Sequence, residues 1–81
     1  MRNIDLRDLS LLAELVKGEH FTKLTGLAIS GFNLDRNRNA IYRRLLFLEA
    51  KGFVSQGFPM QKANRYFITQ KGIKFYEEAI S

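Results

Sequence analysis

Two residue types that suit hydrogen bonding to base edges alternate in the middle of the chain, in the run Arg36-Asn37-Arg38-Asn39. A guanidinium can pair with guanine and a carboxamide with adenine through two hydrogen bonds, each pair worth roughly 1–3 kcal/mol of discrimination. The alternative is an ordinary helix start, in which asparagine caps the helix and arginine points to solvent. We interpret the run as a candidate base-reading segment, because charge alone would not require the asparagines.

The element that must position this run is a helix predicted over residues 35–51, which Gly52 ends in the left-handed conformation. Ile41, Leu45 and Leu48 recur at helical spacing, so one side of this helix faces a core. The side chains that we expect to project outward are Arg36, Asn39 and Arg43, with Arg38 and Tyr42 on the flank. Either Asp35 or Asn37 can cap the helix.

For four side chains of the same helix, the sequence is compatible with two different roles. Tyr42 suits a thymine methyl group or a phosphate, but it equally suits packing beside the second helix, predicted over residues 23–31. Arg44 lies nearer the buried side, where a phosphate contact and a structural pair with Glu49 are both compatible with its position. Leu46 and Phe47 can pack on the last helix or join a partner surface.

The net charge of +5 is confined to the centre of the chain. Residues 31–65 contain seven basic and two acidic side chains, whereas residues 1–30 and 66–81 are each neutral overall. A basic segment of this kind is typical of a nucleic-acid-binding surface, although a solvated basic face is the plainer alternative.

Composition excludes several other classes of protein. We expect 81 residues to form one domain, residues 1–81, and the absence of cysteine rules out disulfides and thiolate metal sites. The longest apolar run is too short to span a bilayer, and the first residues have no secretory core, so we expect a cytoplasmic location. No phosphate-binding glycine loop, metal-ligand spacing or activated nucleophile is present, so we expect neither an enzyme nor a cofactor.

The N-terminal third is predicted to contain a helix over residues 5–17, capped by Asn3 or Asp5 and ended by Gly18. Its expected core stripe is Leu6, Leu9, Leu12, Ala13 and Val16, with Ile4, Leu11 and Leu15 on nearly the opposite side. A short strand over residues 20–22 and a second helix over residues 23–31 are predicted to follow. That second helix would present Leu24, Leu27 and Ala28 on one face.

The C-terminal third is predicted to form a hairpin and a helix. Residues 53–57 and 65–69 are rich in aromatic and β-branched side chains, and Pro59 lies in the polar segment that separates them. Lys62, Asn64 and Arg65 provide hydrogen-bond donors at the hairpin tip. A last helix over residues 70–80 is capped by Thr69. Its inner stripe is Ile73, Tyr76 and Ile80, and Phe75 and Ala79 point elsewhere.

Two segments carry a family resemblance: Ile41-x-x-x-Leu45-x-x-Leu48-Glu49-x-x-Gly52-Phe53-Val54, and Arg65-Tyr66-Phe67-Ile68-Thr69-x-x-Gly72. They resemble the corresponding segments of bacterial and archaeal winged-helix regulators of the MarR and PadR types. The resemblance implies an α+β winged helix-turn-helix fold, with a three-helix core, a β-hairpin wing and a C-terminal helix. It places residues 35–51 in the major groove and residues 60–65 on the minor groove or flanking phosphates, with the helix over residues 23–31 in support.

On this basis we expect a sequence-specific regulator of transcription that binds double-stranded DNA, most simply a repressor. The expected DNA contacts are Arg36, Asn37, Arg38, Asn39, Tyr42, Arg43, Arg44, Lys62, Asn64 and Arg65. The resemblance implies a homodimer through the first and last helices, for which we select Ile4, Leu11, Leu15, Phe75 and Ala79. The alternatives are a winged-helix module that binds another protein in a larger assembly, or RNA binding.

Overall fold

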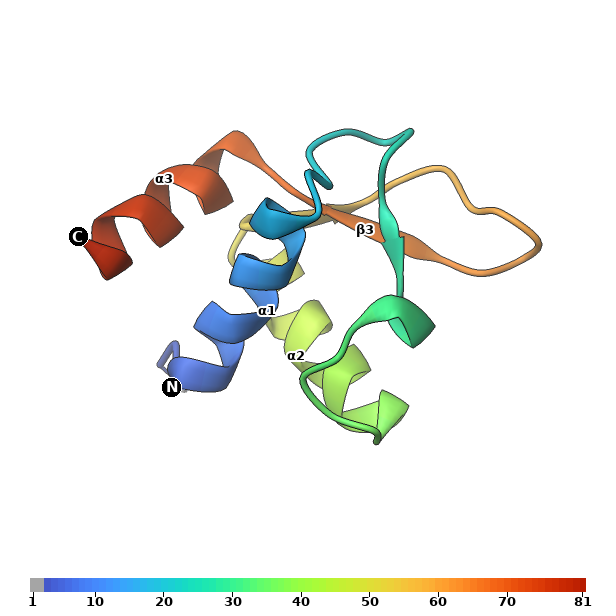
Figure 1. Cartoon of the computed structure of the whole chain (residues 1–81), viewed down its shortest axis with the longest axis horizontal. Helices are drawn as coiled ribbons and strands as arrows, with labels where there is room; N and C mark the ends of the chain where they lie inside the picture. The colour runs from blue at the N-terminus through green and yellow to red at the C-terminus, as the bar shows by residue number, and fades with distance from the viewer. Residues whose placement is uncertain (1–2) are drawn as a thin grey trace.

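The computed structural model describes residues 3–81, which form α-helices around a small antiparallel sheet (Figure 1). In chain order the elements are α1 (Leu6–Lys17), β1 (Leu27–Ala28), the 3₁₀ turn η1 (Ile29–Gly31), α2 (Arg38–Ala50), β2 (Val54–Gln56), β3 (Arg65–Ile68) and α3 (Gln70–Ile80). The strand order is β1-β3-β2, so the last strand of the chain lies in the middle of the sheet. This arrangement brings the N-terminal and C-terminal halves of the chain together.

Helix α1 begins at Leu6 because Asp5 caps it. The Asp5 carboxylate accepts hydrogen bonds from the backbone N–H groups of Arg7 and Asp8, and the Asp8 carboxylate accepts one from Asp5 N at 3.1 Å. This reciprocal capping box satisfies backbone donors that the first turn leaves unpaired. It confirms Asp5 rather than Asn3 as the cap.

The predicted faces of α1 are only partly right. The side chains that α1 buries are Asp8, Leu11, Leu12 and Leu15, whereas Leu6 is 80% exposed. Leu11 and Leu15 therefore belong to the core of the protomer and are not available for a dimer interface. Ile4 also packs against that core. Leu12 is buried as predicted, and Leu9 and Val16 pack against the core, so residues of both expected stripes contribute to it.

The segment before α2 differs most from its prediction. The helix predicted over residues 23–31 is replaced by β1 and η1, and the strand predicted over residues 20–22 is absent. In β1, Leu27 pairs with Tyr66 and Ala28 pairs with Arg65 of β3. Gly26 lies against this strand, where a Cβ atom would come within 3.3 Å of the Tyr66 backbone. The chain is therefore extended here because it completes a sheet with a distant partner.

Helix α2 is anchored by Ile41, Leu45 and Leu48, which are all buried as predicted. It begins at Arg38, because Asn37 is the cap, so the predicted start at residue 35 is too early. Gly52 follows the helix with φ +82°, the left-handed conformation in which glycine avoids the steric cost of a Cβ atom. The inward side of α2 is thus fixed by the core, and its other side is left for contacts.

The hairpin of β2 and β3 confirms the predicted wing. Val54 pairs with Ile68 and Gln56 with Tyr66, and Pro59 lies outside the ladder. At the tip, the backbones of Met60 and Ala63 exchange two hydrogen bonds of 3.2 and 2.9 Å. The two residues between them, Gln61 and Lys62, have φ of 52° and 65°. Positive φ at both central positions matches the twist of a tight hairpin.

Helix α3 spans the residues that were predicted, and Thr69 caps it. The Thr69 hydroxyl accepts from Gly72 N at 3.0 Å and donates to Gly52 O at 2.6 Å, which joins the end of α2 to the start of α3. Phe75 stacks on Phe53 with ring centroids 4.4 Å apart. Phe75 is therefore partly buried against the core of the protomer, and its place in a dimer interface stays a prediction. The far end of α3 and the wing lie at opposite ends of the molecule (Figure 1).

Candidate nucleic-acid interface

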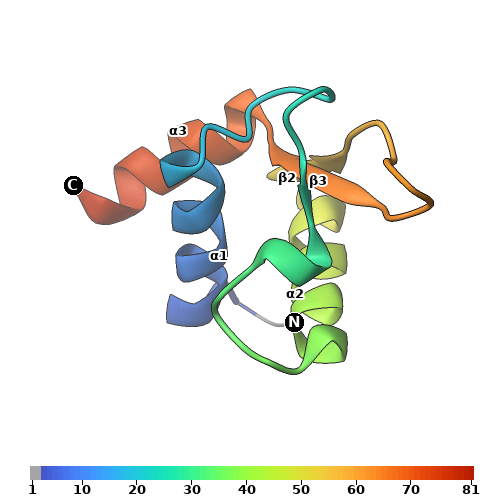
Figure 2. The same cartoon turned by 45° about the vertical axis from the view of Figure 1, so that its right-hand side comes forward.

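The side of α2 that faces away from the core carries Arg38, Asn39 and Arg43, and all three are exposed. Tyr42 lies among them with 40% of its surface exposed. Figures 1 and 2 show that the wing extends from the sheet on the side of α2 that faces away from α1. The base-reading side chains predicted on α2 and the predicted wing therefore border one surface.

A cleft of about 300 Å³ joins these two elements directly. The residues that line this helix–wing cleft are Ala28, Ile29, Ser30, Arg38, Asn39, Tyr42, Ala63 and Asn64. The structure thus brings together Arg38, Asn39, Tyr42 and Asn64 from the predicted set. Lys62 is exposed at the wing tip, and Arg43 is exposed further along α2.

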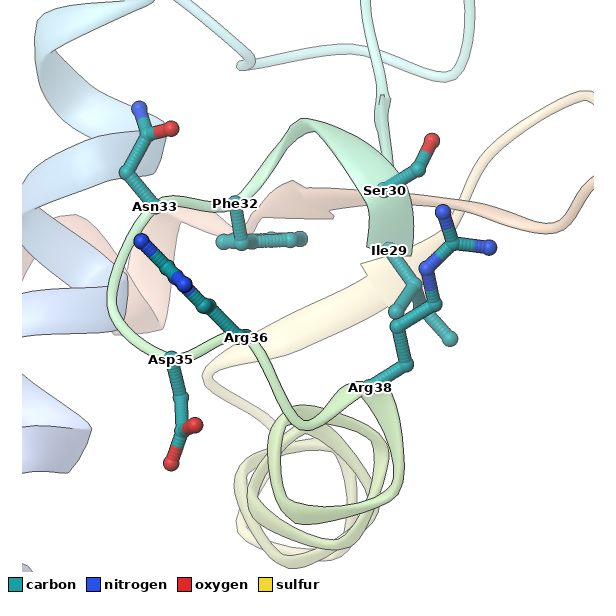
Figure 3. Close-up of a pocket in the computed structure, with 7 residues that line it drawn as sticks. All are labelled: Ile29, Ser30, Phe32, Asn33, Asp35, Arg36 and Arg38. Atoms are coloured by element: carbon teal, nitrogen blue, oxygen red, sulfur yellow. The ribbon is translucent and has the colours of Figure 1, made fainter.

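A second cleft, of about 360 Å³, lies between η1 and the start of α2 and is lined by both Arg36 and Arg38. Figure 3 shows the two guanidinium groups diverging from this cleft. Arg36 extends toward Asn33, and Arg38 extends toward Ser30 and Ile29. The two arginines of the alternating run consequently point to different parts of the surface.

Asn37 has a structural role in this surface. Its side-chain oxygen accepts hydrogen bonds from the backbone N–H groups of Asn39 at 3.0 Å and Ala40 at 3.4 Å. A two-bond contact with adenine would require that same oxygen as an acceptor. Asn37 can therefore read a base only by giving up the cap, whereas Asn39 is exposed and does not cap the helix.

Arg44 is turned inward, away from this surface. Its Nη1 donates to Asp5 Oδ1 at 3.0 Å and to Asp8 Oδ1 at 3.2 Å, and the Asp8 side chain is 0% exposed. Burial alone would lower the pKa of Arg44, but the hydrogen bonds to these two carboxylates raise it above its ordinary value. The DNA contact predicted for Arg44 is replaced by an ion pair with the cap of α1, and the alternative pair with Glu49 does not form.

Arg65 also has a structural partner. It lies in β3 rather than at the wing tip, and its Nη1 donates to the Gly26 carbonyl at 3.2 Å. This bond ties the middle strand to the segment that leads into β1. Arg65 therefore has a structural role, and its predicted DNA contact stays a prediction.

Sequence reasoning missed Ser30, because nothing in the sequence places residue 30 beside residue 64. It also missed the partners of Arg44, which lie 36 and 39 positions earlier in the chain. The one available signal was the spacing of Asp5 and Asp8, which is that of a capping box. A buried carboxylate in such a box requires a positive partner from elsewhere in the fold.

A separate apolar groove of about 450 Å³ runs between α1 and α3, away from the wing. The residues that line this α1–α3 groove are Leu6, Leu9, Ser10, Ala13, Tyr76, Ala79 and Ile80. Leu6 and Ile80 are 80% and 61% exposed. Of the residues predicted to form a dimer interface, Ala79 lies in this groove.

Across residues 3–81, no group of three or more histidine, cysteine, aspartate or glutamate side chains is arranged to hold a metal ion. No helix within the same range is long and apolar enough to cross a membrane.

The order of elements, the central position of β3 and the wing beside an exposed polar helix define a winged-helix fold, of the α+β class. Among solved structures, TubR from Bacillus megaterium pBM400 has a similar fold, with a TM-score of 0.83 and 22% sequence identity. The likeness covers 98% of this chain and 89% of that one. A scan against protein-family models and a search of curated proteins found no match.

Proposed function

We propose that this protein binds double-stranded DNA and reads its sequence, with α2 in the major groove and the wing on the flanking DNA. The observation that carries the proposal is the exposed set Arg38, Asn39 and Arg43 on α2, of which Arg38 and Asn39 line the cleft beside the wing. A helix with such donors, supported from behind by a core, fits the width of the major groove. The winged-helix fold supports the same orientation.

Within this proposal the side chains divide into two groups. Asn39 and Arg43 are the base readers, since both are exposed on the side of α2 opposite Ile41, Leu45 and Leu48. Arg36, Arg38 and Lys62 contact phosphates. If those three cations each neutralise one phosphate, the log–log salt slope is about −3 per protomer.

We also propose that the protein acts as a homodimer in which a second copy covers the α1–α3 groove. The seven residues that line this groove include no charged side chain, so two protomers of net charge +5 can meet there without like charges in contact. A two-fold contact places the same groove on both sides of the interface. A dimer of this kind that occupies a promoter would exclude other proteins from it, so repression is the simplest mode of regulation.

The test is a titration of labelled duplexes at several salt concentrations. We expect binding to weaken steeply with salt and one duplex sequence to compete far better than random duplex. Binding that is independent of sequence and equal for RNA would contradict the proposed readout. Absence of duplex binding, together with capture of an acidic protein partner, would favour the protein-interaction alternative.

A further inference from the structure

The helix–wing cleft has a composition that the proposed base readers do not explain. Four segments of the chain contribute to it: β1, η1, the first turns of α2, and the wing. One part of its lining is apolar, from Ala28, Ile29 and Ala63. The other part is polar, and no acidic side chain lines the cleft.

The polar part includes three hydrogen-bond donors that have no partner in the part of the chain that the structure describes. Among residues 3–81, the side chains of Ser30, Arg38 and Asn64 make no hydrogen bond to one another or to any other residue. Figure 3 shows the Arg38 guanidinium extended toward Ser30. A hydroxyl, a carboxamide and a guanidinium are the side-chain groups that proteins commonly place on phosphate oxygens. The positive end of the α2 dipole further favours an anion near Arg38.

The position of the cleft identifies the anion. A DNA strand separates the major groove from the minor groove, so a protein that enters one with α2 and reaches the other with its wing must straddle the strand. The helix–wing cleft lies between these two elements. Its apolar wall suits the carbon atoms of a deoxyribose, and its donors suit the phosphate that follows.

We propose that the helix–wing cleft seats one sugar–phosphate unit of the DNA backbone, with Ser30, Arg38 and Asn64 on the phosphate. The inference rests on the proposed function and deepens it, because it assigns a DNA contact to the uncharged turn η1. A phosphate held from three separate elements fixes the depth and register of α2 in its groove. This contact to the sugar–phosphate unit does not depend on the base sequence.

The first test places a negative charge in the cleft. Ser30→Asp should weaken binding to every duplex by about tenfold or more, because the added carboxylate repels the phosphate at close range. Ser81→Asp, which adds the same charge at the far end of α3, should change affinity less than about twofold at moderate salt. Circular dichroism establishes that both variants are folded, and Ser30→Ala, which adds no charge, should weaken binding to all sequences by a smaller and equal factor. If Ser30→Asp bound duplexes with unchanged affinity, the proposed phosphate contact in the helix–wing cleft would be wrong.

The second test identifies the phosphate. Single methylphosphonates, which remove one charge from the backbone, are introduced at each position of a bound duplex. In the unmodified protein one position should lose affinity most strongly, and Ser30→Ala should be much less sensitive at that position than at all others. Equal sensitivity of both proteins at every position would overturn the inference while leaving DNA binding itself intact. Failure of the unmodified protein to bind any duplex would instead overturn the proposed function.

The third test separates DNA from a free ligand of the same chemistry. Inorganic phosphate and a deoxynucleoside monophosphate are titrated against the free protein, with amide chemical shifts as the readout. Weak millimolar shifts at residues 30, 38 and 64, abolished by saturating duplex, would support a backbone seat. Micromolar binding of the free nucleotide that duplex does not displace would overturn it in favour of a small-ligand site.

Discussion

Arg43 and Arg44 are neighbours in the chain, but they lie on different sides of α2 and do different work. Arg43 is exposed, whereas Arg44 pairs with a fully buried aspartate and with the cap of α1. A helix rotates each successive residue by about 100°, so adjacent side chains face different surroundings. The inward side of α2 therefore holds the fold together, and its outward side carries exposed polar side chains.

The largest expected effect is the loss of stability caused by a substitution on the inward side of α2. Arg44→Ala leaves the carboxylate of Asp8 buried without its guanidinium, which should cost about 2–3 kcal/mol of the free energy of unfolding. For a domain of this size, that corresponds to a fall in Tm of roughly 10 °C or more. Thermal and urea unfolding measure it.

The neighbouring Arg43→Ala is the matched control for this effect, since an exposed arginine contributes within about 0.5 kcal/mol to stability. Arg44→Lys should recover part of the loss, because an ammonium restores the charge without the planar fork. Equal Tm values for Arg43→Ala and Arg44→Ala would show that the two sides of α2 do not differ as described.

Measurements of duplex binding test the outward side of α2. Arg43→Ala and Asn39→Ala should each lose about 1–3 kcal/mol of discrimination between a preferred duplex and random duplex. Both should unfold at the temperature of the unmodified protein, because neither side chain is part of the core. Fluorescence anisotropy measures the affinities.

Arg7→Ala, which removes an exposed arginine from α1, is the control for charge. It should retain full discrimination. A loss in Arg7→Ala equal to that in Arg43→Ala would mean that the net charge, and not the outward side of α2, governs binding.

The wing should have a smaller effect that is independent of sequence. Lys62→Ala should weaken binding to all duplexes alike and reduce the salt slope by about one. Gln61→Ala is the matched control, because Gln61 shares the tip turn and the left-handed backbone but carries no charge. A change of sequence preference in Lys62→Ala, with an unaltered slope, would contradict a phosphate contact.

The smallest effect concerns Tyr66, whose buried hydroxyl has no hydrogen-bond partner among residues 3–81. Burial, and to a lesser extent the charges of Tyr42 and Glu49, raise the pKa of this phenol above 10. A raised pKa means that Tyr66 contributes stability below about pH 10, the unfolded value, and loses it as the pH rises toward the folded value.

Tyr66→Phe should therefore change the free energy of unfolding by no more than about 1 kcal/mol at neutral pH. Above about pH 10 its stability should fall less steeply than that of the unmodified protein. Tyr76→Phe, which alters a partly buried tyrosine on α3, should retain the steeper fall. Urea unfolding between pH 8 and pH 11, in steps of about 0.5 pH unit, measures the difference in the free energy of unfolding.

Local signals were sufficient for the C-terminal half of the fold. Thr69 is a strong cap, Gly52 has the conformation that glycine permits, and Ile41, Leu45 and Leu48 keep a single helical period. Each of these features depends on residues a few positions apart. For that reason α2, the hairpin and α3 could be predicted from the sequence, with α2 displaced only at its start.

Tertiary contacts determine the parts of the fold and of the candidate site that could not be predicted from the sequence. Leu27 and Ala28 form a strand only because β3, nearly forty positions later, provides the partner backbone. The two apolar sides of α1 were indistinguishable by pattern, and the buried Asp8, which Arg44 neutralises, lies on the side that faces the core. The same long-range pair removed Arg44 from the candidate site, and a cleft between distant segments added Ser30.

The most direct test of the account is selection of bound duplexes from a random pool by the unmodified protein and by Arg43→Ala. We predict that the unmodified protein enriches one motif, that the motif is palindromic if two copies bind, and that Arg43→Ala loses preference at a defined position in each half-site. Enrichment of no sequence by the unmodified protein, or of the same motif with the same preference by both proteins, would contradict the assignment of the outward side of α2 as a DNA-reading surface.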